Sequence, residues 1–215
     1  MKALQLYLKR TYEPDRLCTI TDGVYAIALT LLVLDLKAPE VSGITNPELR
    51  ADLLKQVPNF SAYVIGFFVI SYFWINHHRV FQTVTTCDDR ALRLNLFHLL
   101  FISLTPYAAS LIGRYEGDRI ATIVFSTNLG LAFSSLILLG QYLLAKEEWQ
   151  TKEAGGFWIK SPWWAVYAGP GLALVSIAVS FIKIEVALLL WLLLPLRDWF
   201  LLSRASPRRP QIIKP

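Results

Sequence analysis

Long apolar segments alternate with short charged ones along the chain, and this alternation restricts the possible fold more than any other feature. Hydrophobic residues make up 54% of the 215 residues, and the mean hydropathy is +0.44. About 20 consecutive apolar residues are enough for a helix to cross a bilayer. A soluble helix would show a polar stripe, whereas residues 129–144 show very little of one. The pattern therefore predicts an all-α, polytopic membrane protein.

The apolar segments are numerous enough for six transmembrane helices per subunit. We expect these helices in one domain that covers residues 1–215, with no soluble domain of any size. The expected helices lie at about residues 19–36, 58–78, 91–112, 119–145, 163–182 and 186–202.

The basic residues indicate how these helices are oriented. With six helices that alternate in direction, 15 of the 21 lysines and arginines fall on the side of the membrane that holds the two termini and the connections 2–3 and 4–5. Cytoplasmic loops of membrane proteins carry such an excess. We expect a multi-pass protein of the cell (plasma) membrane with both termini cytoplasmic. The basic loops also explain the net charge of +5, so we expect no nucleic-acid partner.

The first predicted helix offers one narrow face of small and branched residues. At 100° per residue, four residues lie within about 60° of Ile27, and Asp22 lies about 140° away. The four residues are Gly23, Thr30, Leu31 and Leu34. By periodicity alone, such a stripe is best explained by lipid contact or helix packing, since apolar stripes are common in membrane helices.

Asp22 lies close to the start of this helix, where an unpaired carboxylate would be costly. We expect it to join a buried polar network with Arg16 and His77, which would hold the first helix against the second and third. The expected further members are Asn76, Asn95 or His98.

The sequence contains little that indicates catalysis. It has no HExxH or GxSxG motif, and no serine or cysteine with a nucleophile signature accompanies His77. The two cysteines, Cys18 and Cys87, have a spacing that suits no metal site. We therefore expect neither an enzyme nor a resident metal or cofactor.

Two segments resemble a known family. Arg16, then Thr21-Asp22-Gly23 and the run AIALTLLVLDL, resemble the first-helix signature of the transmembrane protein 175 family of potassium-permeable channels. The family motif is an arginine, three intervening residues and then Phe-Ser-Asp. Here Ile20 replaces the phenylalanine, and Thr21 replaces the serine but keeps its hydroxyl. The group Trp74, Asn76 and His77 also resembles the family's second helix.

The resemblance implies a homotetramer with the first helix of each subunit around a central pore. It implies a constriction at Ile27, further pore layers at Leu31 and Leu34, and a role in selectivity for Thr30. No TVGYG filter is present. The expected mechanism is therefore a hydrophobic ring that gates by dewetting and filters weakly. Permeant potassium would be accompanied by other monovalent cations, such as rubidium and cesium.

Alternative functions remain open at this point. A proton-coupled secondary transporter, or a proton pathway, would use Asp22 and His77 as a relay. An intramembrane enzyme is a third alternative, which the missing catalytic motifs disfavour, and a membrane scaffold is also left open. Asp35 and Glu40, which lie near the predicted outer mouth, are candidates for the charge that disfavours anions.

Overall fold

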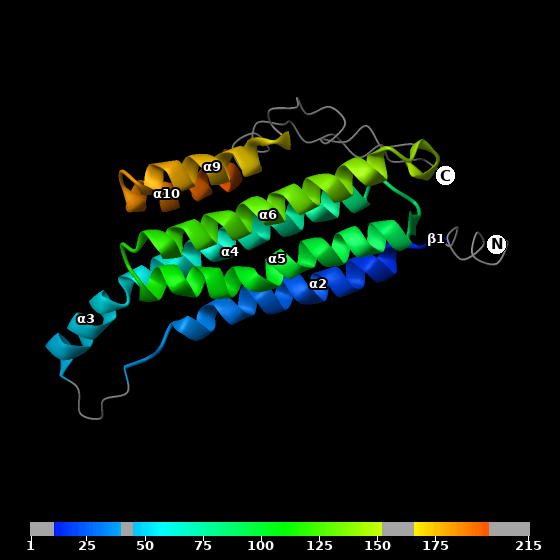
Figure 1. Cartoon of the computed structure of the whole chain (residues 1–215). Helices are drawn as coiled ribbons and strands as arrows, with labels where there is room; N and C mark the ends of the chain where they lie inside the picture. Colours follow the sequence, from blue (N-terminus) through cyan, green and yellow to red (C-terminus); the bar gives the residue numbers. More distant parts are fainter. Residues whose placement is uncertain (1–10, 40–44, 152–165, 198–215) are drawn as a thin grey trace, which may run out of the picture.

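The computed structural model describes residues 11–39, 45–151 and 166–197, and these ranges are mostly helical. Four helices are long and apolar enough to cross a membrane, and they lie side by side (Figure 1). They are α2 (Pro14–Leu31, continued by the 3-10 turn η1, Leu32–Asp35), α4 (Val57–Phe81), α5 (Asp89–Arg114) and α6 (Arg119–Leu144). These helices confirm the prediction of an all-α membrane protein.

The observed boundaries follow the predicted ones closely. The first helix begins at Pro14, five residues before the predicted start. Proline is favoured in the first turn of a helix, because its fixed backbone angle suits that turn and its missing N–H has no partner there. The other boundaries of the four long helices lie within three residues of the predictions.

The fifth and sixth predicted helices are described only in part. α9 (Ala168–Ser180) has 13 residues, and α10 (Ile184–Leu189) continues into the turn η3 (Leu190–Leu192). Residues 163–165 and 198–202, which belong to the two predicted helices, lie outside the described ranges. Six transmembrane helices per subunit therefore stays a prediction.

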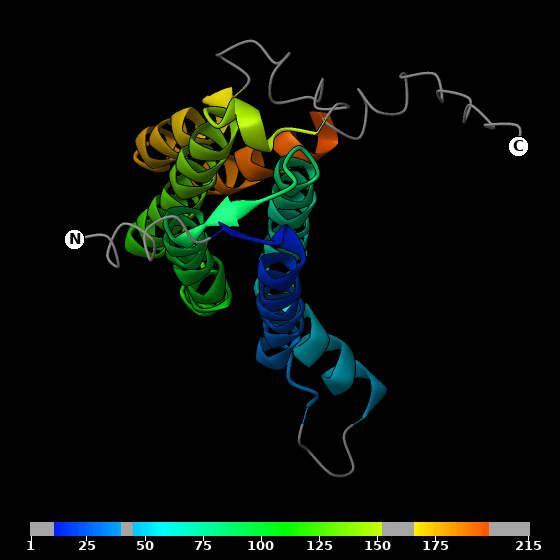
Figure 2. The same ribbon diagram turned by 90° about the vertical axis from the view of Figure 1, so that its right-hand side faces the viewer.

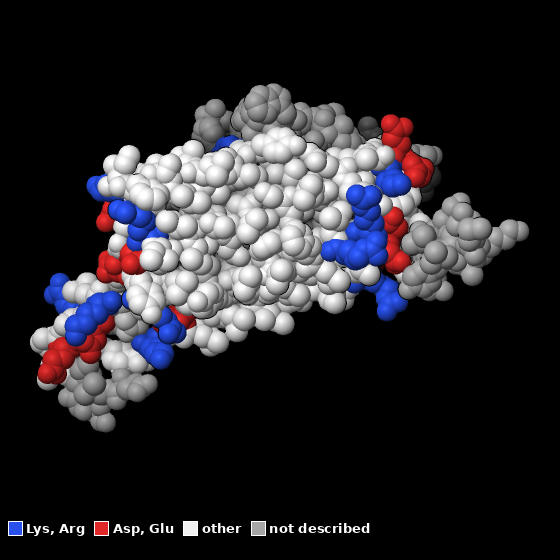
Figure 3. Space-filling view, in the orientation of Figure 1, with Lys and Arg blue, Asp and Glu red and all other residues white. Residues whose placement is uncertain are grey.

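Charged side chains mark the ends of the helical body. Figure 3 shows lysine, arginine, aspartate and glutamate mostly at the two ends, with a wide uncharged band between them. Such a band matches the apolar interior of a bilayer, because charged groups at that depth are costly. Together with the four long apolar helices, this distribution describes a multi-pass membrane protein.

At one end of the bundle, short β contacts join the connections between helices. β1 (Thr11–Tyr12) pairs antiparallel with β2 (Cys87–Asp88) and so ties the start of α2 to the start of α5. The Asp88 side chain caps α5 by accepting from the backbone N–H groups of residues 90 and 91. Cys87 is fully buried, and its burial is the main cause that raises the thiol pKa to about 11. It is therefore a protonated, inert thiol at neutral pH.

A short helix, α3 (Asn46–Lys55), precedes α4, and a 3-10 turn, η2 (Glu147–Trp149), follows α6. α3 begins with a capping box in which Thr45 and Glu48 hydrogen-bond each other's backbone N–H. The hydrogen bonds from Thr45 lower the pKa of the Glu48 carboxyl.

The core lies where α4, α6 and the last described segment meet. The rings of Phe73 and Phe133 are 4.3 Å apart, and the Phe133 ring stacks on Trp191 at 6.2 Å. Both views place α9 and α10 on the side of the bundle away from α2 (Figures 1 and 2). The aromatic core therefore leaves α2 at the opposite edge, packed only from one side.

We predict that Gly169→Ala destabilises this core. An added Cβ would lie 2.3 Å from two ring atoms of Phe133, which is itself held by other rings. Overpacking of this kind costs about 1–3 kcal/mol. Gly171, in the same helix, is the matched control, since a Cβ there meets nothing within 4 Å. Thermal unfolding in detergent should show a lower midpoint for Gly169→Ala alone; equal midpoints would contradict the close packing of α9 on α6.

Candidate functional site

The first long helix has two distinct faces. One face packs against α4 and α5, and its buried side chains are Leu17, Thr21, Tyr25 and Ala28, followed by Leu32 in η1. The other face lies outside the protomer, where Ile27 is 60%, Leu31 is 42% and Leu34 is 68% exposed. Gly23 and Thr30 are exposed as well. The face derived from helical periodicity is thus the face that the protomer leaves uncovered.

Among the described residues, neither of two small residues on this face, Gly23 and Thr30, forms a hydrogen bond to another helix. A Cβ added to Gly23 would meet nothing within 4 Å, so no described contact requires glycine there. The Thr30 hydroxyl lies 2.9 Å from the Ile27 carbonyl and 3.1 Å from the Ala26 carbonyl, to which it donates. Because its hydrogen is used by the helix itself, Thr30 presents only acceptor lone pairs on the exposed side.

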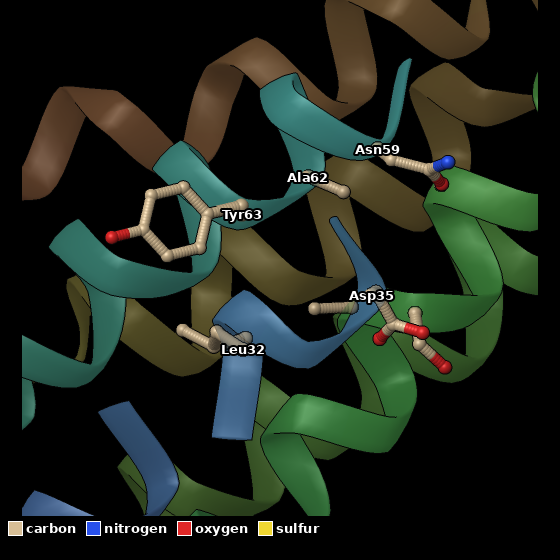
Figure 4. Close-up of a pocket in the computed structure, with 8 residues that line it drawn as sticks. Leu32, Asp35, Asn59, Ala62 and Tyr63 are labelled. Carbon is tan, nitrogen blue, oxygen red and sulfur yellow. The ribbon is translucent and has the colours of Figure 1, made fainter. Parts of the chain in front are cut away.

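The end of this helix is held by an ion pair and a close hydrophobic contact. Asp35 lies 2.9 Å from Arg114 at the end of α5. Leu32 approaches Gly66 of α4, where a Cβ would lie 3.0 Å from the leucine side chain. Figure 4 shows Leu32 and Asp35 beside Asn59, Ala62 and Tyr63 of α4.

A cavity of about 10 Å³ lies between these residues. The Oδ1 atom of Asn59 is buried there and has no hydrogen-bond partner among the described residues. A cavity of this volume holds at most one water, so the space suits a water bound to that amide and is too small for a substrate.

A buried hydrogen-bonded chain joins α2 to α5 and α4. The Asn95 Nδ2 donates to the Thr21 hydroxyl at 2.9 Å, and the Asn95 Oδ1 lies 2.8 Å from His77 Nε2. Because an amide oxygen only accepts, His77 donates from Nε2. All three side chains are at most 2% exposed. Unpaired groups at these positions would carry a large desolvation cost, so the chain fixes how α2 docks.

A second buried chain lies beside the first. The Tyr25 hydroxyl is 2.7 Å from His98 Nε2, and His98 Nδ1 is 3.1 Å from the Ala132 carbonyl and 3.0 Å from the Ser135 hydroxyl. Since a carbonyl only accepts, Nδ1 carries the hydrogen and Nε2 accepts from Tyr25. The His77 and His98 rings stack at 6.0 Å and 11°. Four helices therefore meet in one buried polar layer.

The structure connects the predicted network residues differently from the prediction. Asp22 is exposed and accepts a hydrogen bond from Trp74 Nε1 at 2.8 Å. Asn76 donates to the Tyr72 carbonyl of its own helix. No ion pair between Arg16 and Asp22 occurs in the described part of the chain. The reason is geometric: the six-residue separation places them about 120° apart and about 9 Å along the helix.

Two network members were missed by the sequence interpretation, and both had a usable signal. Tyr25 follows Thr21 by four residues and so shares its face. Ser135 lies on α6, where its hydroxyl donates a hydrogen bond to the Ala132 carbonyl one turn away. Small polar residues that recur inside apolar helices often hydrogen-bond across helices.

We predict that Thr21→Val lowers stability by about 1–2 kcal/mol, because it leaves the buried Asn95 amide without an acceptor. The change keeps the size of the side chain. Thr19→Val, on the exposed side of the same helix, is the control. Thermal unfolding should separate the two variants, and an unchanged midpoint for Thr21→Val would contradict the importance of this hydrogen bond.

No group of three or more His, Cys, Asp or Glu residues that could hold a metal occurs within residues 11–39, 45–151 and 166–197. Nε2 of His77 and both ring nitrogens of His98 take part in hydrogen bonds within the protein.

Comparison with known proteins gives one consistent match. Residues 16–106 match the model of the family described as "Endosomal/lysosomal potassium channel TMEM175". A potassium channel of Streptomyces collinus is 36% identical over 131 residues, which are 58% of this chain and 63% of that relative. The chain thus matches less than two thirds of that relative's length.

The fold is also similar to that of a solved protein. The crystal structure of a homolog of the lysosomal potassium-selective channel TMEM175 from Chamaesiphon minutus has a TM-score of 0.72 and 27% identity, and the match covers 89% of this chain and 98% of that one. A relative named as the endosomal/lysosomal proton channel TMEM175 of Gallus gallus is 24% identical over 188 residues, which are 84% of this chain and 37% of that relative.

Proposed function

The chain belongs to the TMEM175 family of potassium channels, and from this premise we propose that it forms a homotetrameric cation channel whose pore is lined by α2. The observation that carries the proposal is the uncovered face of that helix. Only 28% of the membrane segment that contains α2 is buried in the protomer, against 61% for α6. One protomer cannot enclose a pore with a single stripe, so a closed ring of copies is needed.

The proposed gate is the apolar part of this face. Ile27, Leu31 and Leu34 would form successive rings, spaced about 6 Å and about 4.5 Å along the axis. A narrow hydrophobic ring excludes water and stops ions, and a wider one keeps water continuous and conducts. Gly23 would widen the pore below Ile27, because it adds no side chain.

Thr30 is the proposed polar element between the apolar rings. Its hydroxyl donates to backbone carbonyls of α2, which leaves the oxygen lone pairs to face a cation. Four such oxygens would weakly favour cations over anions. Of the two acidic candidates for that preference, Asp35 is ion-paired with Arg114, and Glu40 lies outside the described residues.

The polar layer would support the gate from behind. Thr21 and Tyr25 lie on the buried face of α2, and their hydrogen bonds to Asn95 and His98 would keep the opposite face directed at the axis. Asp22 and Trp74 would add a third point of attachment, and Arg16 and Asn76 stay proposed members of the same support. The channel would need no cofactor besides the permeant potassium ion.

We place the proposed channel in the plasma membrane with both termini cytoplasmic, on the positive-inside distribution of the basic residues. Membrane lipid and further copies of the chain would be its partners.

Flux measurements on purified protein in liposomes test the proposal. We expect ohmic potassium current, a smaller sodium current, and passage of rubidium and cesium. Cross-linking of the purified protein should give species up to the tetramer. Saturable, pH-coupled uptake instead of current would refute the channel.

A proton pathway is the second candidate, and one observation favours it. The chain from Tyr25 through His98 to Ser135 is continuous and buried, and the Gallus gallus relative is named as a proton channel. A proton current that persists without potassium, and that disappears in His98→Ala while the tetramer remains, would support this function. Loss of potassium and proton current together would favour a purely structural role for His98.

A further inference from the structure

A long groove runs along α4. Its volume is about 430 Å³, and its two walls are α4 and the segment that follows α10, including Leu192 and Leu196. Both walls come from the same protomer, so the groove exists without a second copy of the chain.

The wall on α4 follows a single helical stripe. The lining residues of α4 run from Val64 to Arg79 and include Phe68, Ser71 and Ile75. Fifteen residues of helix extend about 22 Å, and the hydrocarbon depth of one leaflet is about 15 Å. The groove is therefore long enough for one acyl chain together with the start of its headgroup.

The charge among the described lining residues lies at one end of the groove. Arg79 is the charged residue among the described lining residues, and it lies within the last turn of α4. Phe68 and Ile75, farther along the groove, are 51% and 41% exposed. Near its middle, Tyr72 is tied to Arg197 of the facing segment by a hydrogen bond of 3.3 Å, which joins the two walls.

We propose that this groove binds one anionic phospholipid, whose acyl chain lies along Val64–Ile75 and whose phosphate contacts Arg79. A largely apolar groove that ends at the Arg79 guanidinium, near the end of the bundle, matches a lipid with a negatively charged headgroup. A guanidinium has five N–H donors, so Arg79 can contact a phosphate in addition to its protein contacts. The proposal does not depend on which ion the protein conducts.

Lipid titrations monitored by native mass spectrometry test the proposal on the purified full-length oligomer. We expect one site per subunit and a preference of about fivefold for phosphatidylglycerol over phosphatidylcholine, the scale of one basic residue at a membrane surface. Arg79→Gln should remove this preference. Arg93→Gln, an exposed arginine at the same bundle end that does not line the groove, should keep it.

A second measurement does not depend on the stability of variants. Phosphatidylglycerol with a photoreactive acyl chain should label wild-type peptides that contain residues 64–79 and 192–196 more than other membrane-facing segments. Equal labelling on all faces, or an unchanged preference in Arg79→Gln, would overturn the proposal. Disulfide-linked dimers of Ser71→Cys would also overturn it, because they would show a second copy of the chain in the groove.

Discussion

Replacing Ile27 by asparagine should raise resting potassium flux through the reconstituted protein at least about tenfold. Asparagine makes the narrowest proposed ring polar, so water stays continuous there and the barrier for an ion falls. A tenfold change corresponds to about 1.4 kcal/mol, a modest part of the cost of a dry constriction. The measurement is potassium efflux from liposomes at matched protein density. Ile27→Gly should act in the same direction, since it widens the ring.

The control for this experiment lies on the same helical segment. Val33 is also apolar and 46% exposed, but it lies away from the face that carries Ile27 and Leu34. We expect Val33→Asn to leave the flux close to that of the wild type. If both variants leaked equally, the effect would come from loosened packing. Unchanged flux in Ile27→Asn would remove Ile27 as the gate.

Replacing His98 by alanine should produce the largest loss of stability among the variants considered. His98 is fully buried and joins Tyr25 of α2 to Ala132 and Ser135 of α6. Its removal would leave a cavity and unpaired polar groups, each of which costs about 1–3 kcal/mol. A total of about 3 kcal/mol would lower the unfolding midpoint of a chain of this length by about 6–12 °C.

His78 provides the matched control for this variant. It is exposed, stacks on Trp74 and contacts Gln82, so His78→Ala should shift the midpoint far less. The unfolding midpoint of both variants can be measured by heating samples and following the loss of folded protein by size-exclusion chromatography. Equal midpoints for His98→Ala and the wild type would show that the buried layer does not hold the helices together.

Most of the fold could be predicted from the sequence, and the physical reason differs between elements. α4, α5 and α6 can be predicted from hydropathy, because a membrane segment must be apolar over about 20 residues. Asp88 and Asp118 then mark where α5 and α6 begin, because each aspartate caps the N-terminus of the helix that follows it. In the last part of the chain, α9 ends at Ser180, two residues before the predicted end. Residues 163–165 and 198–202 of the two predicted helices lie outside the described ranges.

In the candidate site, the exposed face of α2 could be predicted from the sequence, whereas its hydrogen-bond partners could be predicted only in part. Periodicity placed Ile27, Leu31 and Leu34 on one face, and that face is exposed in the protomer. The polar partners were predicted only in part. Asp22 was expected to meet Arg16 and His77, yet it meets Trp74. Asn95, an expected further member of the network, is the partner of His77.

The sequence by itself determined which residues share a face of α2, because side-chain direction along a helix repeats every 3.6 residues whatever surrounds it. Only the tertiary structure decided which partners those residues have. The Thr21–Asn95 and Tyr25–His98 pairs join positions 74 and 73 residues apart. Such pairs depend on the rotation and depth at which whole helices pack, and these are set by the combined contacts of all the helices.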